Sequence, residues 1–243
     1  MSEASSNTAA PAVEVVGVEK RYGKVVAVDG ITFSLFPGEL VAFIGPNGAG
    51  KSTTLKMLTG QLLPTAGEIR VGGVSVTEEP AKARDLMGYV PEEPILYDYL
   101  SAREFLEFVV SVRGSGDVDG ALEFTELGDD AERLIREYSQ GMRRKTSLAA
   151  AVVARPKVLI LDEALNGLDP PSVVRVKRFL RRLCDEGAAV LLSTHLLDTA
   201  ERVADRVVMI SNGRIVADVK AEEVAGKSLE ELFMERVGGD LEQ

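Results

Sequence analysis

One stretch constrains what this chain can fold into more than any other: residues 41–54, which read VAFIGPNGAGKSTT. An apolar run leads into a glycine-rich loop, and residues that favour a helix follow. In this setting the pattern G-x-x-x-x-G-K-[ST] is typical of a loop that binds phosphate groups between a strand and a helix. Its glycines let backbone N–H groups turn inward, and the positive end of the helix dipole attracts the same anion. The flanking strand and helix favour this interpretation over a glycine-rich turn without a ligand.

The loop predicts contacts to a nucleotide, in which Lys51 and Ser52 have separate roles. We expect Lys51 to reach the β and γ phosphates as a point charge, and the hydroxyl of Ser52 to hold a Mg²⁺ ion. That ion still needs a carboxylate from elsewhere in the chain. The predicted nucleotide-binding residues of the loop are Gly45, Pro46, Asn47, Gly48, Ala49, Gly50, Lys51, Ser52 and Thr53.

A pair of carboxylates follows the apolar run at residues 158–161. In an open parallel α/β sheet, ligands bind at the carboxyl ends of the strands, which is where Asp162 and Glu163 are expected. Asp162 can bind Mg²⁺ through water, and Glu163 can orient or deprotonate an attacking water. A solvated acidic turn is the alternative. It is disfavoured because four apolar residues bury the strand that presents the pair.

His195 is the single histidine of the chain and follows another buried run, residues 188–192. A lone histidine is usually structural. At the same type of strand end as Asp162 and Glu163, however, it can hydrogen-bond a γ-phosphate and sense its loss.

Two further positions carry weaker signals. Ser139 and Gly141 open a helix, and a capping serine followed by glycine leaves free N–H groups suited to an anion, although most such helix starts are only caps. Tyr22, in a predicted loop ahead of the phosphate loop, could stack on an adenine ring. An amphipathic surface tyrosine is equally consistent with the sequence.

Length and composition set the outer limits. With 243 residues, of which 45% are hydrophobic, the chain can bury one large core. The net charge of −10 makes a nucleic-acid partner improbable. A single Cys184 on an apolar helix stripe indicates a core thiol in a reducing compartment. The longest apolar run, residues 148–154, has seven residues, whereas a transmembrane helix needs about 20.

The order of predicted elements divides the chain into regions. Residues 1–12 are expected to be a disordered tail and not a signal peptide. Short β-branched runs and turns fill the region from residue 13 to Ile44, with strands over 13–18, 25–28, 31–36 and 40–44 and a later hairpin over 69–76. A capping box at Ser101 begins a mostly helical region of about 98–155, with helices from 101, over 117–127, and from about 139 to 155. A helix over 170–187, strands over 206–211 and 213–219, and small helices over 221–225 and 229–237 complete the chain.

The joint order of these pieces resembles the ABC ATPase family, the nucleotide-binding subunits of ATP-binding cassette transporters. The resemblance covers residues 13 to about 237, and rests on the phosphate loop, YVPEEP, YSQGMR, LDE, GLD and STH in that order. YVPEEPILY and YSQGMR look most like bacterial export-type cassettes, including the Ecs-type subunits. The fold that the resemblance implies is an α/β, P-loop NTPase core with a mainly parallel sheet, an N-terminal antiparallel β subdomain and an inserted helical subdomain, all in one ATP-binding domain of residues 13–237 before a short tail at 238–243.

The resemblance also implies roles for single residues. Tyr22 matches the adenine-stacking aromatic, Asp162 the Walker B magnesium residue, Glu163 the catalytic glutamate and His195 the switch histidine. Lys51 belongs to the Walker A loop, Asp169 is the D-loop aspartate, and Ser139, Gln140 and Gly141 stand in the signature motif that touches ATP bound to a second subunit. ATP and Mg²⁺ are the implied cofactors. The implied partners are a second cassette, in a homodimer or heterodimer arranged head to tail, and a transmembrane permease subunit contacted near Glu92, on the cytoplasmic face of the membrane.

Several positions depart from the family pattern. Glu92 stands where glutamine is usual, Gln140 and Met142 replace glycine and glutamine, and Ala164 with Leu165 replaces a proline–threonine pair. None of these changes removes a catalytic group. Glu92 becomes an additional candidate metal ligand, because a carboxylate binds Mg²⁺ more strongly than a neutral amide oxygen does.

The sequence favours the ATPase subunit of a membrane exporter over two alternatives. Soluble ABC proteins of DNA repair or translation usually carry long coiled-coil insertions or two fused cassettes, whereas here the span from Glu92 to Ser139 is short and one phosphate loop is present. A non-hydrolysing, nucleotide-gated scaffold is disfavoured by the intact Glu163 and His195.

Overall fold

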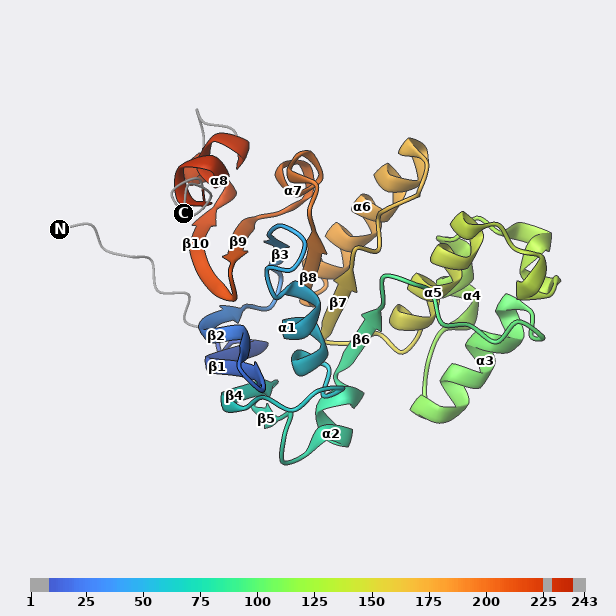
Figure 1. Ribbon diagram of the computed structural model, residues 1–243. Coiled ribbons are helices and arrows are strands. Elements are labelled where there is room, and N and C mark those ends of the chain that lie inside the picture. Colours follow the sequence, from blue (N-terminus) through green and yellow to red (C-terminus); the bar gives the residue numbers. More distant parts are fainter. Residues whose placement is uncertain (1–8, 225–228, 238–243) are drawn as a thin grey trace.

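The strand before the phosphate loop lies inside a six-stranded sheet of a computed structural model that describes residues 9–224 and 229–237 (Figure 1). Five strands of this sheet are parallel, and β10 pairs antiparallel at one edge. Every residue of β3, β7 and β8 is buried, as expected for strands covered on both faces. The order across the sheet is β10 (Arg214–Lys220), β9 (Arg206–Ser211), β3 (Leu40–Ile44), β8 (Ala189–Thr194), β7 (Val158–Asp162) and β6 (Met87–Val90).

A second, antiparallel sheet precedes and covers this one. Its order is β2 (Val25–Leu35), β1 (Val13–Tyr22), β4 (Ala66–Val71) and β5 (Val74–Ser75), and β4 and β5 form the predicted hairpin. The predicted break between residues 28 and 31 was wrong. β2 runs through it, because a bulge opposite β1 accommodates Gly30 with a φ of 64°. β1 is also longer than predicted, so Tyr22 pairs with Val25 at a strand end and does not lie in a loop.

Two apolar cores lie on opposite faces of the parallel sheet. Alternate residues of β3 show the division: Val41 and Phe43 face the antiparallel sheet and α1 (Lys51–Leu58), whereas Leu40, Ala42 and Ile44 belong to the core that contains α6. Helix α1 begins at Lys51 as predicted and ends before Gly60. The remaining helices packed on this part of the chain are α2 (Pro80–Asp85), α6 (Pro170–Asp185), α7 (Leu197–Val203), η3 (Ala221–Val224) and α8 (Leu229–Val237).

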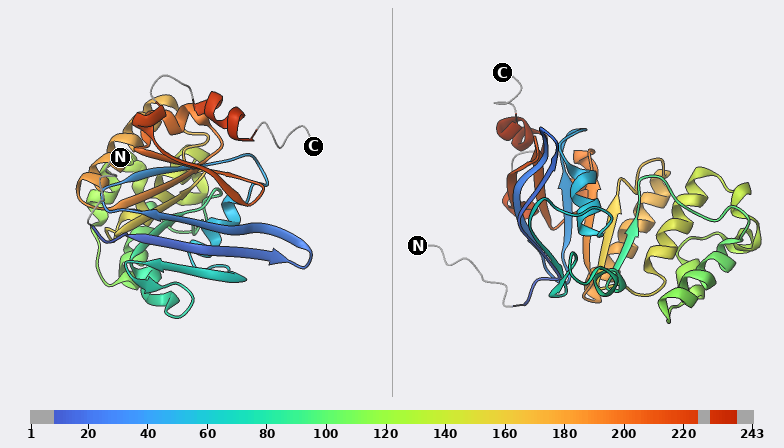
Figure 2. Two further views of the ribbon diagram at one scale, coloured as in Figure 1. Left: turned by 90° about the vertical axis from the view of Figure 1, so that its left-hand side faces the viewer. Right: turned by 60° about the horizontal axis from the view of Figure 1, so that its bottom comes forward.

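The helical subdomain has a core of its own and projects to one side of the two sheets (Figure 2). Its first helix starts with the predicted capping box, in which the Ser101 hydroxyl accepts from Glu104 N–H and the Glu104 carboxylate accepts from Ser101 N–H. The helix predicted over 117–127 is shorter, ending at Glu123. The elements are α3 (Ala102–Arg113), α4 (Val118–Glu123), η1 (Gly128–Glu132), η2 (Ile135–Glu137) and α5 (Gln140–Val152).

The predicted tails lie mostly outside the described residues, which exclude 1–8 and 238–243. Ala12, placed in the first tail by the sequence, already belongs to the folded part. Its N–H donates to Leu35 O at 2.7 Å, and its carbonyl accepts from Gly72 N at 2.8 Å. Of the predicted helix over 221–225, residue 225 lies outside the described part, and η3 covers the rest.

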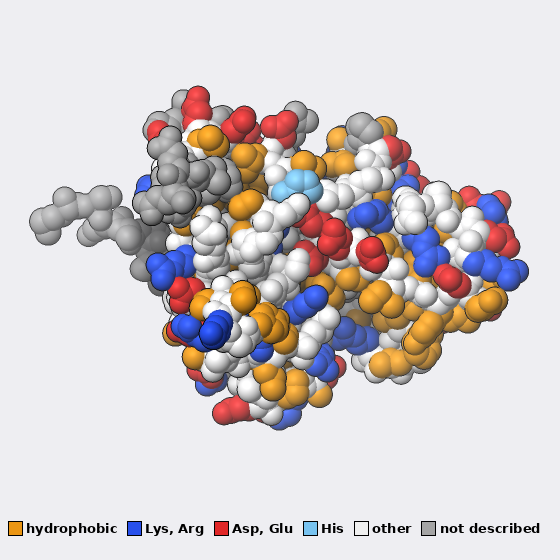
Figure 3. Space-filling model, in the orientation of Figure 1, with side chains coloured by type: hydrophobic (Ala, Val, Ile, Leu, Met, Phe, Trp, Pro, Cys, Tyr) orange, Lys and Arg blue, Asp and Glu red, His pale blue; other side chains and the backbone are white. Residues whose placement is uncertain are grey.

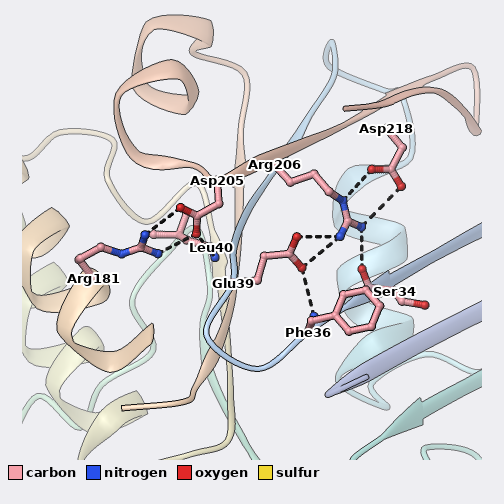
Figure 4. A network of polar contacts seen from close by, with 8 residues as sticks. All are labelled: Ser34, Phe36, Glu39, Leu40, Arg181, Asp205, Arg206 and Asp218. Carbon is pink, nitrogen blue, oxygen red and sulfur yellow. Dashed lines mark hydrogen bonds and ion pairs between the residues drawn. The ribbon is translucent and has the colours of Figure 1, made fainter. Parts of the chain in front are cut away.

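An ion-pair network joins the elements at the amino ends of the parallel strands (Figure 4). Arg206, at the start of β9, donates to Glu39 at 2.8 Å, to Asp218 at 2.7 Å and to the Ser34 carbonyl at 2.7 Å. It therefore links β2, the turn before β3, and β10. Beside it, Asp205 accepts two bonds of 2.7 Å from Arg181 of α6 and one of 2.8 Å from Leu40 N–H.

The acid stability of the fold should depend on Asp205. Burial opposes its ionisation, but Arg181 and the Leu40 N–H outweigh burial and lower the pKa of Asp205 below its usual value. The ionised form then stabilises the fold above the unfolded-state pKa of about 4, and this contribution is lost as pH falls through the lower folded value. Asp205→Asn should cost about 1 kcal/mol at pH 7, and its difference from wild type should narrow below about pH 4.

Urea unfolding at pH 7, 4 and 3 measures this difference. Asp185→Asn, at the exposed end of α6, is the matched control and should match wild type at each pH. A constant gap between wild type and Asp205→Asn at every pH would contradict the assignment.

Candidate functional site

A cavity of about 270 Å³ lies at the carboxyl edge of the parallel sheet, over the start of α1. It brings together segments that are far apart in the sequence: the phosphate loop, the segment after β6, the end of β7 and the residue after β8. Its lining residues are Ala27, Pro46, Asn47, Gly48, Gly50, Lys51, Ser52, Thr53, Glu92, Glu163 and His195.

The phosphate loop is fixed by close backbone packing. A Cβ on Gly45 would lie 2.3 Å from the Ile210 carbonyl, and one on Gly50 would lie 2.6 Å from the Ala27 carbonyl. Gly50 also has a φ of 107°, which L side chains rarely adopt. From the β9–β10 turn, Gly213 N–H donates to the Ala49 carbonyl at 3.0 Å, so the loop is held from the sheet side as well.

Lys51 is almost fully buried beneath this loop. Its Nζ donates to the Gly45 carbonyl at 2.6 Å and to the Pro46 carbonyl at 3.2 Å, and lies 3.9 Å from Glu163 Oε1. Burial lowers the pKa of Lys51, while the carboxylates of Glu163, Asp162 and Glu92 oppose that shift. The ammonium is thus positioned between the loop and the acidic residues of the cavity.

Asp162 reaches the site through the register of the sheet. It pairs with Ser193 of β8, and Ile44, the last residue of β3, pairs with Thr194. Burial raises the pKa of Asp162, the nearby Ser193 hydroxyl opposes that rise, and the charges of Glu92 and Glu163 add to it. Among the described residues, neither Asp162 Oδ1 nor the neighbouring Ser193 Oγ has a hydrogen-bond partner, although both atoms are buried.

Glu163 and His195 form a pair across the ends of β7 and β8. Glu163 Oε2 lies 3.1 Å from His195 Nδ1 and accepts from Asn166 Nδ2 at 3.0 Å. The Glu163 carboxylate is buried, whereas the histidine ring is half exposed at the rim. Glu163 has a φ of 50°, in the left-handed region where residues other than glycine are uncommon.

Glu92 lines the cavity from the loop after β6, with its side chain exposed. The negative charges of Glu92 and Asp162 both oppose the lowering of the Lys51 pKa by burial, and both add to the rise in the pKa of Tyr89. For Tyr89, burial and then the Asp162 charge raise the pKa of the phenol to about 12, with Glu92 adding to the rise. An acidic group therefore lies at the opening of the cavity beside the phosphate loop.

The donor set suits a hydrated Mg²⁺ held partly by phosphate oxygens. The described residues contain no group of three or more His, Cys, Asp or Glu side chains that could bind a metal alone. They do offer the unpartnered oxygen of Asp162 and the hydroxyl of Ser52, with Glu92 at the opening. Because Mg²⁺ keeps several waters and uses one or two carboxylates with substrate phosphates, these residues fit it.

Eight predicted site residues do not line the cavity. Gly45, Ala49 and Asp162 directly adjoin lining residues in the sequence, and the other five come from elsewhere in the chain. Ser139, Gln140 and Gly141 stand at the tip of α5 in the helical subdomain, where the Ser139 hydroxyl accepts from Met142 N–H at 3.3 Å. Asp169 caps α6, accepting from Ser172 N–H at 2.8 Å. Tyr22 is half exposed on the β1–β2 hairpin, with Lys20 Nζ 5.3 Å from its ring centre.

The structure adds two residues that the sequence did not single out. Ala27 lines the cavity from β2, and no local sequence pattern marks this strand residue. Asn166 has no role predicted from the sequence, yet its side-chain amide donates to the Glu163 carboxylate. Its position three residues after Glu163, inside a tight turn, was the available signal.

The fold and cavity define a phosphate-loop α/β protein with a helical subdomain inserted after β6. The family description "ABC transporter" matches residues 28–166. The Nod factor export ATP-binding protein I of Ralstonia nicotianae (strain ATCC BAA-1114 / GMI1000) is 35% identical over 237 residues, which cover 95% of this chain and 74% of that protein. The daunorubicin resistance ATP-binding protein DrrA3 of Streptomyces coeruleorubidus is 36% identical over 223 residues, covering 89% and 71%.

A solved structure described as an ATP binding subunit of an ABC transporter superposes with a TM-score of 0.87 at 32% identity, covering 93% of this chain and 99% of that one. This chain therefore belongs to the ABC transporter family, among its ATP-binding subunits. The resemblance stated from the motifs is confirmed, and so is the predicted fold class.

The packing of the phosphate loop predicts that its glycines differ in how well they tolerate substitution by alanine. Gly45→Ala should lower the free energy of unfolding by about 3 kcal/mol, because the new methyl group meets a backbone carbonyl that cannot rotate away. Gly48→Ala should cost about 1 kcal/mol, since its φ of 81° is unfavourable but nothing lies within 4 Å. Urea unfolding without nucleotide measures both, and equal losses would contradict the packing argument.

Proposed function

We propose that this chain binds and hydrolyses MgATP and thereby powers a membrane exporter. The observation that carries the proposal is that Lys51, Glu163, His195 and Glu92 line one phosphate-loop cavity, with the charge of the buried Asp162 acting on Lys51. The two relatives named for export and for drug resistance support outward transport. No helix among the described residues is long and apolar enough to cross a membrane, so in this proposal a permease subunit provides the transport path.

ATP would bind with its phosphates in the loop of residues 45–53. Inward N–H groups and the start of α1 attract the phosphates, and Lys51 would exchange its bonds to the loop carbonyls for phosphate oxygens. The exposed ring of Tyr22 is available for the adenine base.

Mg²⁺ would be held by Ser52 and, through water, by Asp162, with Glu92 contributing a further carboxylate. The bound ion would neutralise charge on the β- and γ-phosphate oxygens. Deprotonated carboxylates are required for this role, and a nearby cation favours that form of Asp162 against the effect of burial.

Glu163 would take a proton from the attacking water. Its Oε2 is engaged with Asn166 and His195, while Oε1 faces Lys51 across 3.9 Å. His195, at the rim, can contact the γ-phosphate and the glutamate together, so loss of the phosphate would alter its hydrogen bonding.

A second copy, or a related cassette, would complete each site. Ser139, Gln140 and Gly141 lie away from the cavity of their own chain, and Ser139 and Gln140 are exposed. In a head-to-tail dimer these N–H groups at the start of α5 could meet ATP bound to the partner, with Asp169 at the same interface.

The permease would contact the helical subdomain and the loop that carries Glu92. Large apolar side chains gather there without cover, and Figure 3 shows apolar surface over the helical subdomain. An exposed apolar patch of this kind marks a protein interface. Its residues are Ile95, which is 81% exposed, Tyr97, Tyr99, Phe108 and Val112. This contact would place the chain on the cytoplasmic face of the membrane.

Hydrolysis is tested at Glu163. Glu163→Gln should retain ATP binding but slow hydrolysis by roughly 10²-fold or more, because a positioned base is lost. The ATP-bound dimer should then persist and elute as a dimer with MgATP on size-exclusion chromatography. Glu186→Gln, at the other end of the parallel strands, is the matched control and should behave as wild type. A Glu163→Gln variant that stays monomeric and hydrolyses ATP normally would contradict both assignments.

The role of Glu92 is tested by the concentration of Mg²⁺ that ATP hydrolysis requires. Glu92→Gln should hydrolyse ATP at the wild-type rate in saturating Mg²⁺ but need more free Mg²⁺ for half-maximal rate, since an amide oxygen is the weaker ligand. Glu92→Ala should also lower the maximal rate. Titrations of ATPase rate, and of Mg²⁺-dependent binding of a fluorescent ATP analogue, decide the point. Three superimposable curves would mean that Glu92 does not meet the metal.

A further inference from the structure

In the turn after β7, Asn166 makes two hydrogen bonds to the proposed base, Glu163. Asn166 Nδ2 donates to Glu163 Oε2 at 3.0 Å, and Asn166 N–H donates to the Glu163 carbonyl at 3.1 Å. One residue therefore holds both the carboxylate and the backbone of the proposed base. The amide is half-buried, and the carboxylate that it contacts is buried.

Glu163 needs such support because its backbone is in an unfavourable conformation. A φ of 50° persists in a non-glycine residue only where neighbouring contacts hold it. Glu163 N–H donates to the Ser193 carbonyl at 3.1 Å, and Arg144 of α5 adds a longer bond of 3.4 Å to the Glu163 carbonyl. These bonds fix the main chain but leave the carboxylate free to rotate.

The two carboxylate oxygens have different surroundings. Oε2 is shared by the Asn166 amide and His195 Nδ1, whereas Oε1 faces Lys51 at 3.9 Å. The histidine ring is half exposed at the rim, whereas Asn166 lies in the same turn as Glu163 and also bonds its backbone. Of the two groups on Oε2, Asn166 is therefore the one held in place by the turn itself.

We propose that Asn166 is a positioning residue for hydrolysis: its amide holds Glu163 Oε2 so that Oε1 presents its lone pairs to the attacking water. This inference rests on the proposed function. Asn166 acts through Glu163 and does not line the nucleotide cavity, so it should affect the chemical step and not the binding of ATP.

The test is a comparison of Asn166→Ala with wild type in the full-length chain. The backbone bond to Glu163 survives this change, so only the amide donor is lost. kcat should fall roughly 10-fold, the scale of one hydrogen bond to a charged group, while the Kd for a fluorescent ATP analogue and the unfolding midpoint stay near wild type. Asn166→Asp, nearly isosteric but with a carboxylate beside Glu163, should lose more activity than Asn166→Ala.

A double-mutant cycle distinguishes loss of Glu163 positioning from a general loss of order in the turn after β7. In single-turnover assays, Asn166→Ala should cause no further loss when Glu163 is already glutamine, since there is no base left to position. Glu186→Gln, at the exposed C-terminal end of α6 and outside the nucleotide cavity, is the control and should keep the wild-type kcat.

Two results would overturn the role of Asn166 while leaving the proposed function intact: a wild-type kcat in Asn166→Ala, or an undiminished further loss in the Glu163→Gln background. Absence of ATP hydrolysis by the wild-type chain would overturn both the proposed function and this inference.

Discussion

The register of three parallel strands is the constraint on which the site depends. Backbone hydrogen bonds place β8 between β3 and β7, pairing Ile44 with Thr194 and Asp162 with Ser193. The phosphate loop, the acidic pair and the histidine therefore leave the sheet at one level, although residues 51 and 195 are far apart in the chain. A slip of one residue would turn each strand's side chains to the opposite face, and the two apolar cores make that slip costly.

That register gathers more negative than positive side chains around the cavity. One buried ammonium, Lys51, faces the carboxylates of Asp162, Glu163 and Glu92. Burial favours the neutral form of Asp162 and of Lys51, and Asp162 retains an unpartnered oxygen. Phosphates alone would add to the negative charge, and a divalent cation alone would leave Lys51 on its loop carbonyls. Under the proposed function, a nucleotide together with Mg²⁺ would supply partners for both signs.

Much of this could be predicted from the sequence because the relevant signals are local. The phosphate loop, the capping box at Ser101 and the apolar run before Asp162 each fix an element within a few residues. The error at residues 28–31 has a physical reason: an Asp-Gly pair indicates a turn when read locally, whereas pairing with β1 absorbs it as a bulge. Ala12 was missed similarly, since its bonds are to Leu35 and Gly72, distant in sequence.

The site was less accessible to sequence reasoning where geometry depends on tertiary contacts. Motif order marked Lys51, Asp162, Glu163 and His195, and the fold brings them to one edge. No motif revealed that Asn166 holds Glu163, because the contact is a property of the folded turn, in which residue 163 has a left-handed φ of 50°. Motif order also could not show that Ala27, a residue of strand β2, lines the cavity.

The helical subdomain explains why the cavity of one chain is incomplete under the proposed function. The subdomain has its own core and is attached through the segments before α3 and after α5. Ser139 and Gly141 lie in it, at the start of α5 and outside the cavity that Lys51 lines. Through Arg144, the same helix reaches the Glu163 carbonyl of its own chain. A ligand that attracts the tip of α5 in one copy thus acts on a helix that also touches the proposed base of that copy. A ligand shifts the equilibrium between monomer and dimer only if it binds one of the two more tightly. ATP held between two copies would therefore favour the dimer, and its hydrolysis would remove that stabilisation.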